Sequence, residues 1–179
     1  MKKTLFIVLA SLLLSQCQLF KKEEKPELPP ETQEGKRTMG CRVDGEIWLP
    51  EYSSRPVFSG SEYSVIYEGS FYGMSLNADK KRESRVYFNV LNVPGTGTYE
   101  LYKFISKEPS GFKLITKAYY NDNTGDFETD SLHTGMLTIT KLDLQKAIIS
   151  GTFYFDAYNK ETGKVVKITE GRFDYPLGR

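Results

Sequence analysis

The sequence is poor in the side chains on which metal and nucleophilic chemistry most often depends. Its 179 residues include one histidine, two cysteines and one tryptophan. Two cysteines cannot build a disulfide-rich scaffold or a four-cysteine zinc site, and a single histidine excludes most zinc catalysis. Excess charge of one sign is also missing, because 24 Lys and Arg residues face 23 Asp and Glu residues. This balance gives no electrostatic basis for nucleic-acid binding.

Aromatic residues, by contrast, are plentiful. The chain holds 12 tyrosines and 11 phenylalanines, and 39% of its residues are hydrophobic. Side chains of this size can fill a core, which argues against a wholly disordered chain. The length predicts a single domain, since roughly 100–200 residues per domain is usual.

The longest apolar run lies at the N-terminus, behind Met1-Lys2-Lys3. It covers residues 5–14 and would extend about 15 Å as a helix, about half of a bilayer's hydrocarbon core. A permanent membrane span is therefore not expected. A positive start followed by a short apolar run is typical of a signal peptide, which we place at residues 1–16.

The end of this run, Leu14-Ser15-Gln16-Cys17, resembles the bacterial lipobox. The resemblance implies that the Cys17 thiol receives a diacylglycerol, that cleavage occurs just before Cys17, and that the new amino terminus carries a further acyl chain such as palmitate. Two or three acyl chains anchor a protein stably, because each buried methylene contributes about 0.8 kcal/mol. An aspartate directly after the acylated cysteine would resemble an inner-membrane retention signal. Gln18 occupies that position here, so we expect the outer membrane. The alternative is a plain secretory signal with an incidental cysteine.

Residues 17–40 predict an acylated cysteine followed by a disordered tether. This stretch mixes charged residues and prolines and has little apolar surface to offset the entropy of ordering. Lys22-Glu23-Glu24 also resembles the export signal of Bacteroidota surface lipoproteins. That resemblance implies exposure on the cell surface, with the periplasmic face of the membrane as the alternative.

Residues 41–179 predict one all-β domain. Apolar and polar residues alternate with a period of two over residues 86–90, 137–140 and 149–156, and turn-forming Gly, Pro, Asn and Asp separate these stretches. We expect a single antiparallel β-sandwich or barrel of about nine to eleven strands.

Two motifs in this domain resemble those of small Bacteroidota lipoproteins that belong to a domain-of-unknown-function family. The first, over residues 41–50, is similar to the opening C-x-V-[DN]-G-x-x-W-x-P; the second, over residues 151–174, is similar to the closing hairpin G-T-F-x-F-x-A … I-T-x-G-x-F-D. The resemblance implies an all-β module of the cell envelope and no catalytic residues.

Three acids, Asp126, Glu128 and Asp130, alternate with Phe127 and Thr129. A strand would place the three carboxylates on one face, about 7 Å apart. Such oxygens could hold Ca²⁺, which takes six to eight oxygen ligands. The alternative is a solvated strand face, and a glycosidase acid/base pair would need a partner that the sequence does not identify.

Trp48 and Tyr52 form a candidate platform for stacking on sugars, although aromatic side chains of a β-domain also serve as core. His133 predicts an ordinary loop histidine. Cys41 predicts either a buried small hydrophobe or a reactive thiol.

These features together predict a lipid-anchored cell-envelope binding module without enzymatic activity. Its expected partners are the membrane, through Cys17, and a glycan or protein ligand, with no nucleic acid and no cofactor other than the covalent lipid. Two alternatives stay open: a calcium-dependent polysaccharide-processing enzyme using Asp126, Glu128 and Asp130, and a periplasmic structural accessory.

Overall fold

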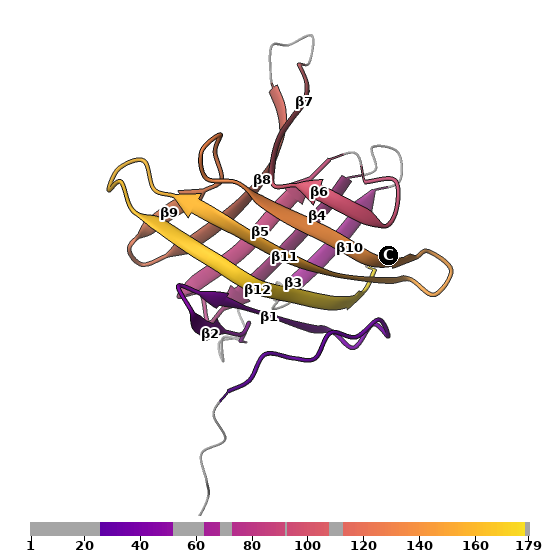
Figure 1. Cartoon of the computed structure of the whole chain (residues 1–179). Coiled ribbons are helices and arrows are strands. Elements are labelled where there is room, and N and C mark those ends of the chain that lie inside the picture. Colours follow the sequence, from indigo (N-terminus) through magenta and orange to yellow (C-terminus); the bar gives the residue numbers. More distant parts are fainter. Residues whose placement is uncertain (1–25, 52–62, 69–72, 92, 108–112, 178–179) are drawn as a thin grey trace, which may run out of the picture.

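A computed structural model describes residues 26–51, 63–68, 73–91, 93–107 and 113–177 (Figure 1). This part of the chain is all-β, as predicted, and its strands pair antiparallel throughout. The strands number twelve, slightly more than the nine to eleven expected, because β2, β6 and β9 have only three or four residues each. Within the described ranges no helix is long and apolar enough to cross a membrane.

The strands follow one another along the chain with the bounds listed here. They are β1 (Thr38–Val43), β2 (Glu46–Trp48), β3 (Tyr63–Glu68), β4 (Gly73–Lys80), β5 (Ser84–Val90), β6 (Gly97–Glu100), β7 (Tyr102–Lys107), β8 (Lys113–Asp122), β9 (Gly125–Glu128), β10 (Gly135–Asp143), β11 (Ile148–Tyr158) and β12 (Val165–Pro176).

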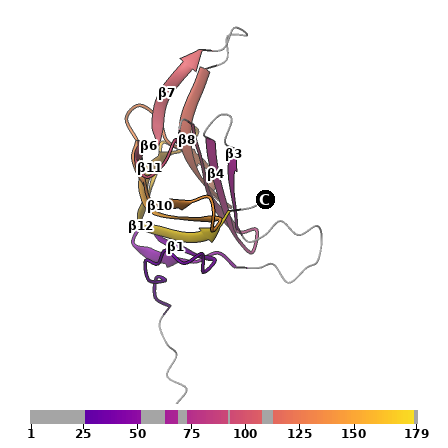
Figure 2. The ribbon, with the colours of Figure 1, turned by 90° about the vertical axis from the view of Figure 1, so that its right-hand side faces the viewer.

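A single sheet folds over on itself to make two layers. Its strand order is β2-β1-β12-β11-β9-β8-β5-β4-β3, with β10 between β11 and β6, and β7 beside β8. Figures 1 and 2 show β1, β10, β11 and β12 in one layer, which we call the front layer, and β3, β4, β5 and β8 in the other, the back layer. The short strand β9 joins the layers at one corner, where Glu128 pairs with Tyr158 of β11.

The core lies between the two layers and is rich in phenylalanine. The Phe88 ring of β5 lies 5.4 Å from that of Phe153 in β11 and 6.4 Å from that of Phe173 in β12, between centroids. The inward face predicted over residues 149–156 is confirmed, since Ile149, Gly151, Phe153 and Phe155 are all buried. Ser150, expected on the opposite side, is buried as well and donates a hydrogen bond to the Asp174 carboxylate. Period-two patterning therefore decides which side of each strand faces the core.

The β1–β2 hairpin confirms a predicted Asp-Gly turn. Asp44 and Gly45 have φ angles of +49° and +88°, the left-handed conformations that a two-residue primed turn requires. The side chain of Asp44 also accepts a hydrogen bond from the Lys167 backbone N–H at 2.8 Å, which ties this turn to β12.

The folded part begins earlier than predicted. Residues 26–37, which we call the strap, lie within the region expected to be a disordered tether over residues 17–40. The Asp174 carboxylate of β12 accepts hydrogen bonds from the Thr32 hydroxyl and from the backbone N–H groups of Glu34, Gly35 and Lys36, at 2.5 to 3.2 Å. The predicted tether is therefore too long. The strap is bound to the domain because the distant Asp174 carboxylate accepts hydrogen bonds from it.

Candidate functional site

The outward side of the back layer carries an ordered set of polar and aromatic side chains, which we call the tyrosine face. It consists of the outward side chains of β4, β5, β8 and β9, continued at the corner by Tyr158 of β11. Strand register aligns its central row, in the order Asn77, Tyr87, Tyr119, Glu128 and Tyr158.

This arrangement follows from alternation along each strand. In β5, Val86 and Phe88 are buried and Tyr87 between them points outward; in β8, Ala118 and Tyr120 are buried on either side of Tyr119. Because neighbouring strands pair in fixed register, outward residues from separate parts of the sequence meet in rows.

Two tyrosines occupy the centre of the face. The rings of Tyr87 and Tyr119 stack with centroids 4.4 Å apart and planes inclined by 8°, and both side chains are half-buried. Burial, with nearby negative charge, raises the pKa of both phenols above the ordinary value of 10.0. At neutral pH both hydroxyls therefore stay protonated and can donate as well as accept hydrogen bonds.

Glu128 sits beside the tyrosines between two lysines. The Lys117 ammonium lies 2.7 Å from one carboxylate oxygen, and Lys160 contacts the other. Burial alone would raise the pKa of Glu128, but the hydrogen bonds and charges of the two lysines outweigh it and lower that pKa below the ordinary value. Glu128 is thus ionised at neutral pH and is not suited to act as a general acid.

A second aromatic pair lies at the end of the central row. The His133 ring stacks on Tyr158 with centroids 4.8 Å apart and planes inclined by 6°. His133 Nδ1 also lies 2.9 Å from Asp130 Oδ1, and the same oxygen accepts the backbone N–H groups of Leu132 and His133. Asp130 therefore fixes a tight turn that presents Leu132, which is 85% exposed.

Paired polar groups flank the tyrosines on both sides. Arg85 forms an ion pair with Asp79 at 3.1 Å. Asn121 donates a hydrogen bond to Asp126, and Ser75 donates one to Asn89 at 2.6 Å. These groups hold one another in place, so the surface is ordered before any ligand arrives.

The predicted calcium site does not assemble. Asp126 and Glu128 both lie on β9, but Asp130 lies beyond the strand and closes the turn before His133. Burial alone would raise the pKa of Asp130, but its backbone and His133 hydrogen bonds outweigh this and lower it. Each carboxylate has a different set of donors, and the described ranges contain no group of three or more potential metal ligands.

The predicted platform for stacking on sugars is not exposed at Trp48. Trp48 is only 4% exposed, and its indole N–H donates to the Ser84 hydroxyl at 2.8 Å. Trp48 is thus a core residue that links β2 to the start of β5. Its predicted partner Tyr52, like the predicted lipid-attachment residue Cys17, lies outside the described residues.

Cys41 is a buried residue of β1 and not an exposed thiol. Burial raises its pKa to about 12. The thiol therefore stays protonated and unreactive at neutral pH, which agrees with the interpretation of Cys41 as a small hydrophobe.

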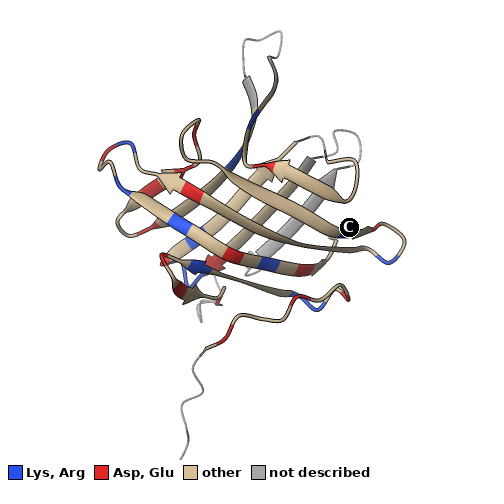
Figure 3. Cartoon of the chain, viewed as in Figure 1, with Lys and Arg blue, Asp and Glu red and all other residues tan. Residues whose placement is uncertain are grey.

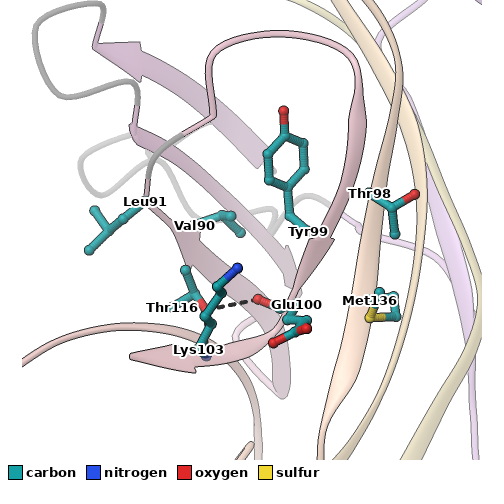
Figure 4. A pocket seen from close by; sticks show the side chains of 8 residues that line it. All are labelled: Val90, Leu91, Thr98, Tyr99, Glu100, Lys103, Thr116 and Met136. Carbon is teal, nitrogen blue, oxygen red and sulfur yellow. Dashed lines mark hydrogen bonds between the residues drawn. The ribbon is translucent and has the colours of Figure 1, made fainter. Parts of the chain in front are cut away.

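A small cavity opens near the base of the β7–β8 hairpin (Figure 4). Its volume is about 120 Å³, and its lining consists of Val90, Leu91, Thr98, Tyr99, Glu100, Lys103, Thr116 and Met136. The buried Thr116 hydroxyl is already satisfied, because it donates to the Glu100 carbonyl and accepts the Lys103 N–H, each at 2.8 Å. The cavity has room for a few waters only, far below the 300–1,000 Å³ of usual ligand pockets.

The sequence alone did not identify the tyrosine face. Patterning predicts that Tyr87 and Tyr119 point outward, but their stacking depends on the β5–β8 register, which joins residues 32 positions apart. Sequence neighbours such as Tyr119 and Tyr120 instead point to opposite sides of the sheet.

Comparison with known proteins places the chain in a family. No curated protein and no solved structure matches it. A family model described as a domain of unknown function (DUF6252) matches residues 56–175. The match includes all of the tyrosine face and the closing hairpin, but not the opening motif over residues 41–50. The chain therefore belongs to the DUF6252 family.

Proposed function

We propose that this protein is a lipid-anchored, carbohydrate-binding module of the bacterial cell envelope, and that the tyrosine face is its binding surface. The observation that carries the proposal is the in-register row of Tyr87, Tyr119, Glu128 and Tyr158 across four strands. Such a row presents aromatic and hydrogen-bonding groups together on a rigid sheet.

The chemistry of this face suits a sugar. A pyranose ring offers C–H groups on its faces and hydroxyls around its rim. Tyrosine has both an apolar ring and a hydroxyl, so it can meet both kinds of group. The lysines, asparagines and carboxylates beside the tyrosines add donors and acceptors for the hydroxyls.

Binding without catalysis fits the state of the carboxylates. A glycosidase needs a carboxylic acid whose pKa is raised so that it can protonate the leaving group. Glu128 and Asp130 instead have lowered pKa values. We therefore propose a binding role and not polysaccharide processing.

The membrane anchor completes the proposal. The resemblance of residues 14–17 to a lipobox supports acylation at Cys17, and the resemblance of Lys22-Glu23-Glu24 to a surface-export signal supports outer-membrane display on the cell surface. The strap, which follows the anchor in sequence, is bound to β12 of the front layer. The tyrosine face on the back layer would then meet glycans.

The test uses the mature chain from residue 17 with Cys17→Ala, applied to a panel of immobilised glycans. We expect wild-type binding to at least one glycan class and its loss in Tyr119→Ala with the melting temperature largely retained. Tyr154→Ala is the matched control, since Tyr154 is 55% exposed on the front layer. Absence of any glycan binding, or equal loss in both variants, would refute the proposal.

A further inference from the structure

We infer that the ligand is a neutral oligosaccharide of at least three ring units, which lies across the strands and binds without a metal ion. The inference rests on the proposed function and deepens it. Its end units would pack against the ring edges and polar groups of two aromatic stations, the Tyr87–Tyr119 pair and the Tyr158–His133 pair, in each of which the two rings cover each other's faces. Its middle unit would lie over Glu128.

The spacing of the stations sets the length. Tyr119 pairs with Glu128, and Glu128 pairs with Tyr158, so two strand spacings separate the stations. Neighbouring strands lie about 4.8 Å apart, which puts the stations about 10 Å apart. A pyranose unit with its linkage is about half that length, so one unit fits between the two end units.

The middle position offers hydrogen bonds and not a third ring. The Glu128 carboxylate is held by Lys117 and Lys160, and each ammonium group has three N–H donors. Lys117 also lies 6.0 Å from the centroid of the Tyr102 ring. Each lysine is oriented by these contacts and retains N–H groups for the hydroxyls of a middle sugar.

The charges indicate a neutral ligand. Each cationic side chain near the central row already has an acidic partner. The described side chains there comprise three cations (Arg85, Lys117 and Lys160) and four carboxylates (Asp79, Asp126, Glu128 and Asp130). The front-layer strands β11 and β12 likewise carry Lys and Arg mixed with Asp and Glu (Figure 3). Among the described residues of this face, a uronate or a sulfated sugar would meet no unpaired positive charge, whereas a neutral polyol needs only donors and acceptors.

Metal-free binding follows from the same pairing. The carboxylates of β9 and the following turn are occupied by Asn121, two lysines and backbone N–H groups. They hold no vacant oxygen cluster of the kind that bridges a sugar through Ca²⁺.

The experiment is a calorimetric titration of the mature Cys17→Ala chain with a length series of neutral oligosaccharides. The probes are α- and β-1,4-linked glucose and mannose oligomers from monosaccharide to hexasaccharide, with oligogalacturonates as charged counterparts. We expect affinity to rise about tenfold between disaccharide and trisaccharide, the gain from contact with the second aromatic pair. Chelation with EDTA should leave every affinity unchanged.

Variants separate this inference from the proposed function. Tyr158→Ala should remove the gain at the trisaccharide while leaving monosaccharide binding at Tyr87–Tyr119, and Tyr158→Phe should keep the gain. Binding that depends on Tyr119 but not on ligand length, tighter binding of oligogalacturonates, or loss with EDTA would overturn the inference alone. Failure of every sugar to bind, as for a protein-binding module, would overturn the proposed function as well.

Discussion

Individual carboxylates in this chain have very different roles, which depend on the donors around them. Asp174 is 1% exposed and accepts hydrogen bonds from three strap N–H groups and from the hydroxyls of Thr32 and Ser150. Burial alone would raise its pKa, but these donors outweigh burial and hold the pKa well below the ordinary value of 3.8. Asp174 is thus an ionised anchor for the N-terminal segment.

This depressed pKa predicts a pH dependence of stability. A carboxylate with a lowered folded-state pKa stabilises the fold above its unfolded pKa, and this contribution is lost as the pH falls below about 3.8. We expect Asp174→Asn to reduce the free energy of unfolding by about 3 kcal/mol at pH 7, because bonds to a charged acceptor are lost. Urea denaturation from pH 7 to pH 3 should show the two proteins converging as the pH falls.

Asp156→Asn is the control for this experiment, because Asp156 forms only a surface pair with Lys167. We expect it to change stability by less than about 1 kcal/mol. A constant stability difference between wild type and Asp174→Asn across the whole pH range would show that Asp174 does not act through its charge.

Trp48 gives a second prediction at this scale. Trp48→Ala should cost about 4 kcal/mol of stability because it empties a large core volume. Trp48→Phe should cost only about 1 kcal/mol, mainly through the lost hydrogen bond to Ser84. Thermal melts and glycan titrations of Trp48→Phe check this, and loss of glycan binding at an unchanged melting temperature would restore Trp48 as a binding residue.

Local sequence predicts where individual strands and turns form, whereas it does not predict which distant segments contact one another. Alternation over residues 149–156 predicts the buried apolar residues of β11, although not the buried Ser150, and Asp44-Gly45 predicts the first hairpin turn. The strap is different, because its partner Asp174 is 138 to 142 residues away along the chain. Composition alone classifies such a segment as disordered, since nothing local shows that a distant carboxylate binds it.

The candidate site was only partly predictable for the same reason. Glu128 was expected on an outward strand face, where the structure has it, but its two lysine partners are set by register and loop geometry. The sequence suggests an exposed platform at Trp48, because nothing in the residues around a tryptophan shows whether its ring is buried. Tyr87 and Tyr119 become a pair only once β5 and β8 are aligned.

Close packing of β10 against β11 depends on Gly151. A Cβ atom at this position would lie 2.3 Å from the Thr138 carbonyl oxygen and 2.9 Å from the Phe173 ring. We expect Gly151→Ala to destabilise the domain by about 2 kcal/mol, because the backbone of β10 and a core ring must both shift. Gly95→Ala is the control, as a Cβ there meets no atom within 4 Å; equal melting temperatures for the two variants would contradict this packing.

In the whole molecule, the strap would shorten the proposed link between membrane and domain. If Cys17 is acylated, the chain between Cys17 and the described start at residue 26 extends at most about 30 Å. We expect wild type in the outer-membrane fraction and Cys17→Ala in the soluble fraction. Protease treatment of intact cells should digest the wild-type domain; protection until lysis would place it on the periplasmic face instead.

The proposed function requires that ligand binds on the tyrosine face, and chemical-shift mapping tests this most directly. Isotope-labelled mature Cys17→Ala chain would be titrated with the tightest-binding neutral oligosaccharide. We expect the largest shifts at Tyr87, Tyr119, Glu128 and Tyr158, with none beyond noise at the front-layer residue Tyr154. Shifts centred on the cavity near Tyr99 and Thr116, or on the front layer around Tyr154, would contradict this binding surface.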